Sequence, residues 1–146
     1  LFEDLSVYPR LMLHIESYYH APRVWMGYRQ RPGSALSELT PVQLQHWMAA
    51  LDGYAQVLQN APGVDAATRF EVSLYCARTF VRTAQKLAAT PRPLTPDIWH
   101  EMIGQWSSAS PLSEADFLQA CWQRFHVLRA LQFAFWMRRA RAKATG

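Results

Sequence analysis

Two short groups of residues near the start of the chain carry side chains suited to chemistry. The first is the acidic pair Glu3-Asp4, which precedes a segment whose apolar residues recur at helical spacing. The second is the segment 29–34, where Arg29 and Arg31 lead into the turn sequence Pro32-Gly33-Ser34. A carboxylate can accept a proton from an attacking hydroxyl, and arginine binds phosphate in a fixed geometry. Both groups also have a purely structural interpretation, because acids favour helix N-termini and arginines are common in solvated turns.

Short elements are expected to position these groups. Apolar spacing predicts a helix from 4 to about 16, and aromatic and β-branched residues predict extended segments over 17–20 and 23–29. After Ser37 the pattern is helical throughout, with one helix from 41 to the Pro62-Gly63 break, one over about 66–89, one starting at 96 and one from 113 to about 141. Thr95-Pro96 and Ser113 are typical helix starts. The sequence therefore predicts a mainly α fold with a four-helix bundle-like part.

The order of these features resembles the end of the catalytic domain of family 2 glycosyltransferases of the GT-A type. In that family an acidic pair opens a helix beside the acceptor site, and a later tyrosine-arginine segment leads to a proline-glycine-serine loop, here Tyr28 to Ser34. The likeness covers about a quarter of the chain. It implies that residues 1–37 are the C-terminal end of a GT-A catalytic domain, formed by a short helix-strand segment. Residues 38–146 would then be a helical C-terminal extension.

The resemblance implies inverting transfer of a sugar from a nucleotide-sugar donor to a hydroxyl of a polysaccharide or lipid-linked glycan acceptor. Asp4 would then be the catalytic base, and Glu3 would orient it or contact the acceptor. Arg29, Arg31 and the Gly33-Ser34 turn would bind the nucleoside diphosphate that leaves, because cations and donors must meet its growing negative charge.

The donor-binding half of such an enzyme is not recognisable in this sequence. There is no Asp-x-Asp motif, no alternating strand-helix pattern and no glycine-rich phosphate loop. The resemblance implies that a full-length parent supplies this half together with a divalent metal, Mg or Mn, for which this chain has no identifiable ligands. We expect the chain alone to be inactive. Its start at Leu1-Phe2, without Met or a signal peptide, suggests a cut through a longer protein.

The last predicted helix suggests a second function. Between residues 117 and 146 there are six basic residues and no acidic one. An apolar stripe runs along the same stretch and comprises Leu118, Trp122, Phe125, Leu128, Leu131 and Phe135. Such a stripe usually packs into a core, but it could also bring residues 124–143 into peripheral contact with an anionic membrane. The chain would then be a non-catalytic helical module that contacts a membrane or a partner protein.

Composition limits the remaining possibilities. A hydrophobic content of 50% with 18% charged residues excludes a disordered tail, and no apolar run approaches the roughly 20 residues that span a bilayer. No nucleic-acid motif accompanies the basic residues, so we expect no nucleic-acid partner. Cys76 and Cys121 are predicted to be reduced core thiols, and the scattered histidines predict no structural metal. We expect a cytoplasmic protein, at the inner face of the cell membrane if the second function holds.

Overall fold

The computed structural model describes residues 41–59, 61–89 and 94–146, together with residues 7, 11, 14–17, 19, 20, 22 and 23. Five helices occupy the three long ranges, and no strand occurs anywhere in the described residues. The prediction of a mainly helical fold is confirmed for this part of the chain. The helices are α2 (Pro41–Gln59), α3 (Ala66–Ala88), α4 (Pro96–Ala109), α5 (Glu114–Gln123) and α6 (Val127–Ala144).

Only parts of the segment 1–37 belong to the described residues. Val7 and Leu11 are helical, in agreement with the first part of the helix expected over 4–16, but residues 14–16 are not helical, and the His14 backbone N–H donates to the Leu11 carbonyl at 3.0 Å in a turn. Tyr19 and His20 are neither helical nor in a strand. Residues 24–37 lie outside the described residues. The strand that would close a GT-A domain, and the domain division near residue 37, therefore stay predictions.

Polar caps set the starts of α3 and α5. The Asp65 carboxylate accepts the backbone N–H of Thr68 at 2.7 Å, and this hydrogen bond lowers the pKa of Asp65. The Ser113 hydroxyl oxygen accepts the backbone N–H of Asp116 at 3.2 Å, while its proton is donated to the Asp116 carboxylate at 2.6 Å. The sequence predicted Ser113 as a helix start, and this prediction is confirmed.

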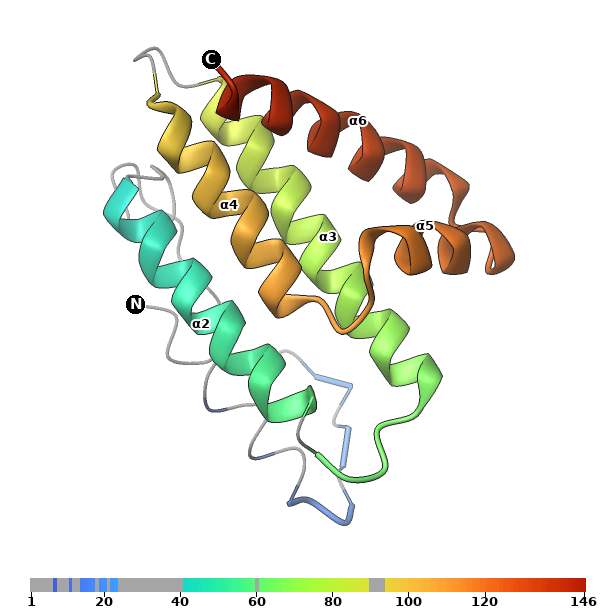
Figure 1. Ribbon diagram of the computed structural model, residues 1–146. Helices are drawn as coiled ribbons and strands as arrows, with labels where there is room; N and C mark the ends of the chain where they lie inside the picture. Colours follow the sequence, from blue (N-terminus) through green and yellow to red (C-terminus); the bar gives the residue numbers. More distant parts are fainter. Residues whose placement is uncertain are drawn as a thin grey trace.

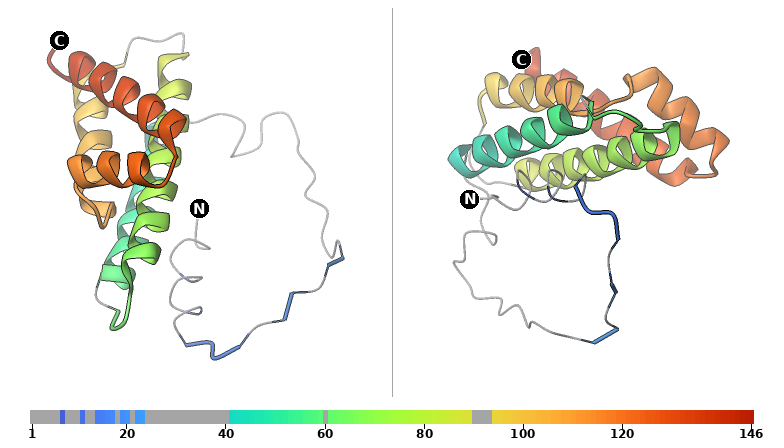
Figure 2. Two further views of the ribbon diagram at one scale, coloured as in Figure 1. Left: turned by 90° about the vertical axis from the view of Figure 1, so that its right-hand side faces the viewer. Right: turned by 90° about the horizontal axis from the view of Figure 1, so that it is seen from below.

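The helices form two layers. Figure 1 shows α2, α3 and α4 running side by side, with α6 crossing over α3 and α4. Figure 2 shows α5 and α6 together on one side of the other helices. Because α6 packs against both α3 and α4, and α2 packs against α4, the last helix closes the bundle rather than extending from it.

Aromatic side chains from four helices meet at the centre of the bundle. Phe133 of α6 lies 5.2 Å from Phe117 of α5 and 4.7 Å from Trp106 of α4, measured between ring centroids. Phe80 of α3 meets the same Phe133 ring at 5.6 Å. The three phenylalanines are almost completely buried. Edge-to-face pairs of this kind contribute about 0.5–1.5 kcal/mol beyond the area they bury, so Phe133 joins both layers.

The prediction of a single helix over 113–141 is wrong, because the chain breaks between α5 and α6. The His126 N–H donates to the Cys121 carbonyl at 2.8 Å, and the Phe125 N–H donates to the Trp122 carbonyl at 3.3 Å. These are the two bonds of a Schellman motif, which ends a helix with a residue in the left-handed region. Here that residue is Phe125, with φ of 60°. Glycine or asparagine usually fills this position, so the sequence carries no signal for the break.

Candidate interaction surface

The residues predicted to carry catalysis all lie outside the described residues. This applies to the expected base Asp4 and its neighbour Glu3, and to the expected phosphate contacts Arg29, Arg31, Gly33 and Ser34. Their geometry therefore stays a prediction. Two other surfaces in the described part of the chain have the features of binding sites, and both involve α6.

The first surface is the solvent-facing side of α5 and α6. Its large apolar side chains are between 55% and 92% exposed. On α6, Leu128, Leu131 and Phe135 are spaced three and four residues apart, which places them on one side of the helix. We call this set the apolar face. It comprises Trp122, Phe125, Leu128, Leu131 and Phe135.

The apolar face corrects the interpretation of the predicted stripe as core. The core side of α6 is a different set of residues, and it includes Phe133 and Met137, which the sequence analysis did not place on the stripe. Only Leu118 of the predicted stripe is partly buried. The core side is made mostly of small residues, which allow α6 to lie close to α3 and α4. It comprises Ala130, Phe133, Met137, Ala140 and Ala144.

Phe125 is the most exposed member of the apolar face. Its side chain is 92% exposed while its backbone holds φ of 60°, a conformation that costs a bulky residue roughly 1–2 kcal/mol. In the turn before α3, by contrast, the positive φ of 82° belongs to Gly63, which adopts it without strain. Because the exposed ring adds no packing energy to offset the backbone strain, its position suggests a role in binding rather than in folding.

Basic side chains flank the apolar face. Arg139 lies over the Trp136 ring at 5.5 Å and Arg124 lies over the Phe70 ring at 4.6 Å, both measured to the ring centroid. Arg138 and Lys143 are exposed near the end of α6. With Phe135 they help to line a groove of about 650 Å³ between the end of α6 and the start of α4. The face thus combines apolar side chains with cations and, from residue 117 to the end, no acid.

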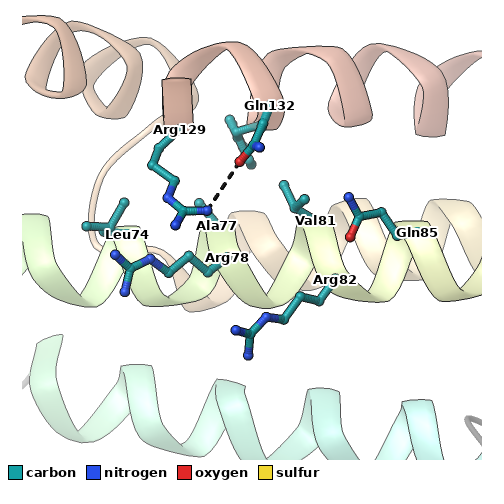
Figure 3. A pocket seen from close by; sticks show the side chains of 9 residues that line it. Leu74, Ala77, Arg78, Val81, Arg82, Gln85, Arg129 and Gln132 are labelled. Carbon is teal, nitrogen blue, oxygen red and sulfur yellow. Dashed lines mark hydrogen bonds between the residues drawn. The ribbon is translucent and has the colours of Figure 1, made fainter. Parts of the chain in front are cut away.

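The second surface is a groove of about 340 Å³ between α3 and α6, shown in Figure 3. Arg78 and Arg82 come from α3, and Arg129 comes from α6. The Arg129 guanidinium donates to the side-chain oxygen of Gln132 at 3.2 Å. We call these three residues the arginine triad. The rest of the lining carries no acidic residue and comprises Leu74, Ala77, Val81, Gln85, Gln132 and Phe133.

The sequence analysis missed the arginine triad. Helical spacing identified the apolar side of α3, and Arg78 and Arg82 lie one turn apart near its edge. Nothing in the spacing indicates that Arg129, far along the chain, lies across the groove from them. A basic pair four residues apart with no acid beside it is the one signal that could have drawn attention to this part of α3.

The two cysteines are free and buried, as the sequence predicted. Burial raises the pKa of the Cys76 thiol to about 12 and also raises the pKa of Cys121. The Cys76 sulfur lies 3.8 Å from the Ala109 carbonyl, to which its proton is directed. Because the thiolate is the reactive form, neither residue is suited to act as a nucleophile.

Neither a metal site nor a membrane span is found in the residues that the structure describes. No group of three or more histidine, cysteine or acidic side chains lies close enough together to hold a metal ion, and no helix is long and apolar enough to cross a bilayer.

Fold and surfaces together define a helical module with an apolar, cationic face and a separate arginine-lined groove. Comparisons of the chain with family models, with curated proteins and with solved structures give no match. The function must therefore be argued from the residues themselves.

Proposed function

We propose that this chain is the C-terminal part of an inverting glycosyltransferase that transfers a sugar from a nucleotide donor to a hydroxyl of a polysaccharide or lipid-linked glycan. The observation that supports the proposal is the ordered series of the acidic pair Glu3-Asp4, a helical segment and the turn from Arg29 to Ser34. Neither group is specific alone, but their order and spacing together resemble the end of a family 2 catalytic domain.

In the proposed reaction, Asp4 takes the proton from the acceptor hydroxyl as its oxygen attacks the anomeric carbon. Glu3 orients that carboxylate or contacts the acceptor. Arg29 and Arg31, with the Gly33-Ser34 turn, stabilise the negative charge on the departing diphosphate. The donor-binding half belongs to the parent protein, so catalysis requires more than these 146 residues.

The test is the substitution Asp4→Asn in the full-length protein. Loss of a general base should lower the transfer rate by about 10²–10⁴-fold, while binding of the nucleotide sugar, measured by calorimetry, stays unchanged. Glu16→Gln is a matched control, because it removes one carboxylate from an exposed position of the same segment. Near-normal transfer by the Asp4 variant would disprove the assigned role.

A second function is favoured by the exposure of the apolar face. We propose that residues 124–143 bind the surface of an anionic membrane, which would place the protein at the cytoplasmic side of the cell membrane. Complementary charge supports a bilayer as the partner, because cations flank the apolar side chains and residues 117–146, which supply the whole apolar face, include no acid. Each large apolar side chain that becomes fully buried in the bilayer contributes about 1.5–3 kcal/mol to the free energy of membrane binding. Each basic residue near the membrane surface contributes about 1 kcal/mol.

Vesicle sedimentation tests this second function. The protein should bind phosphatidylglycerol-containing vesicles and release them at high salt, and it should bind pure phosphatidylcholine weakly. Leu128→Ser combined with Leu131→Ser should abolish binding. Tyr19→Ser is the control, because it removes an exposed apolar side chain that lies outside the helices. Absence of binding by the unmodified protein at low salt would rule out the membrane function.

A further inference from the structure

The arginine triad lines one groove between α3 and α6 with three basic side chains. Arg78 and Arg82 lie on successive turns of α3, and Figure 3 shows Arg129 extending from α6 toward that helix. None of the nine lining residues is acidic. Arg129 donates a hydrogen bond to a neutral partner, the side-chain oxygen of Gln132, so this contact leaves its charge uncompensated. The groove is therefore a site of concentrated positive charge.

The like charges of the triad carry a small energetic cost in the free protein, because the exposed side chains are screened by solvent. Two like charges four residues apart on a helix repel each other, and the third approaches from the opposite side of the groove. An anion bound at the groove would offset this repulsion. The structure thus carries an electrostatic preference for a ligand with more than one negative charge.

The groove also has the size and the lining of a ligand site. Its volume of about 340 Å³ lies within the range of about 300–1,000 Å³ that is usual for small-molecule pockets. Leu74, Val81 and Phe133 form apolar parts of its wall. Gln85 and Gln132 add amide groups that can donate hydrogen bonds beside the arginines.

We propose that the groove between α3 and α6 binds a phosphate or diphosphate group through the arginine triad. Arginine's planar fork makes paired hydrogen bonds with phosphate oxygens, and three such forks suit a ligand that has several oxygens and at least two charges. A single carboxylate has only two oxygens to offer. The proposal does not depend on sugar transfer, since it involves none of residues 1–37.

Calorimetric titration of the 146-residue chain with inorganic pyrophosphate at low ionic strength tests the proposal. The unmodified chain should bind one pyrophosphate saturably. Arg129→Gln, and separately Arg78→Gln with Arg82→Gln, should each weaken binding at least about tenfold, because each removes charge-assisted hydrogen bonds. The affinity of Arg129→Lys for pyrophosphate should lie between those of the unmodified chain and Arg129→Gln, since lysine keeps the charge but loses the planar fork of arginine. Circular dichroism should show unchanged helix content, because these side chains are exposed.

Arg138→Gln is the matched control, because it removes the same charge from an exposed position of α6 outside the groove. It should change the affinity for pyrophosphate by less than about twofold. Equal weakening by Arg138→Gln and Arg129→Gln would show that only diffuse charge attracts the anion. That outcome, or the absence of saturable binding by the unmodified chain, would overturn the proposal.

A phosphate group could come from a lipid headgroup or from a soluble molecule, and vesicles that contain phosphatidic acid separate the two. If the ligand is a headgroup, Arg129→Gln should lower vesicle binding and free pyrophosphate should compete with the vesicles. If the ligand is soluble, vesicle binding should be the same for Arg129→Gln and the unmodified chain while pyrophosphate binding differs. Both results support a phosphate site, and each assigns its source.

Discussion

Arg141, in the last turn of α6, donates two hydrogen bonds to the carboxylate of Glu114, in the first turn of α5, with one nitrogen to each oxygen. This bidentate salt bridge joins the start of α5 to the end of α6. The other ends of the two helices meet at the strained turn around Phe125. The pair of helices that carries the apolar face is therefore fixed at both ends. Because Arg141 is engaged in this contact, it belongs to the fold rather than to the cations that flank the face.

We expect the Arg141–Glu114 pair to contribute modestly to stability. A double-mutant cycle with Arg141→Gln and Glu114→Gln should give a coupling energy of about 0.5–1 kcal/mol, because more than half of the arginine side chain is exposed and solvent screens the pair. Urea unfolding followed by circular dichroism measures it. The coupling should shrink at high salt, and a value that salt leaves unchanged would contradict the electrostatic origin.

Phe125→Gly should stabilise the protein. Glycine removes the penalty of the left-handed backbone, and the exposed ring has little packing to lose. This gain is partly offset by the greater conformational entropy of glycine in the unfolded chain. The net increase in the free energy of unfolding should be about 0.5–1 kcal/mol. Phe125→Ala is the control, since it loses the ring but keeps the strain, and it should show no such gain in urea unfolding. A less stable glycine variant would mean that the ring supports the turn.

The two phenylalanines Phe133 and Phe135, on the same helix, should respond very differently to truncation. Phe133→Ala leaves a cavity at the meeting point of four helices and should cost about 3–5 kcal/mol. Phe135→Ala should change stability by less than about 0.5 kcal/mol, because its ring is exposed. Instead it should weaken binding to anionic vesicles. Equal losses of stability would contradict the assignment of the two faces of α6.

The stability should fall in alkaline solution between about pH 9 and pH 12. The Cys76 thiol has an ordinary pKa of 9.0 and a folded pKa of about 12, so the unfolded chain loses this proton first as the pH rises. Stability is therefore complete below pH 9 and is lost toward pH 12. Burial also raises the pKa values of Tyr54 and Tyr75, which act in the same direction.

Urea unfolding of Cys76→Ala across this range measures the contribution of the thiol. The variant should lose stability less steeply with pH than the unmodified protein, whatever its stability at neutral pH. An identical slope would show that the thiol does not contribute.

Much of the helical fold follows from local sequence. The starts of α4 and α5 are visible in Thr95-Pro96 and in the Ser113 cap, and the Pro62-Gly63 break marks the end of α2. The break at Phe125 could not be predicted, because its cause is a backbone conformation that phenylalanine rarely adopts. Apolar spacing identified a stripe on α6, but it could not tell which of two neighbouring sides would face the core. That choice depends on the small residues that allow close packing.

The candidate sites also differ in how far the sequence alone predicts them. The acidic pair and the arginine-bearing turn in residues 1–37 are close in sequence to a known pattern, so they can be proposed without coordinates. The arginine triad arises only when α6 crosses α3, because it joins side chains from distant parts of the chain. Tertiary contact, rather than residue type, creates that groove.

The position of Trp122 has an experimental consequence. It is exposed beside Phe125 on the apolar face, whereas Trp99 and Trp106 are buried in the core. Its indole fluorescence should therefore lie at long wavelength in the free protein and shift to shorter wavelength when the face leaves water, on top of the emission of the five other tryptophans of the chain. The chain thus carries its own optical reporter for whatever covers this face, and no dye has to be attached.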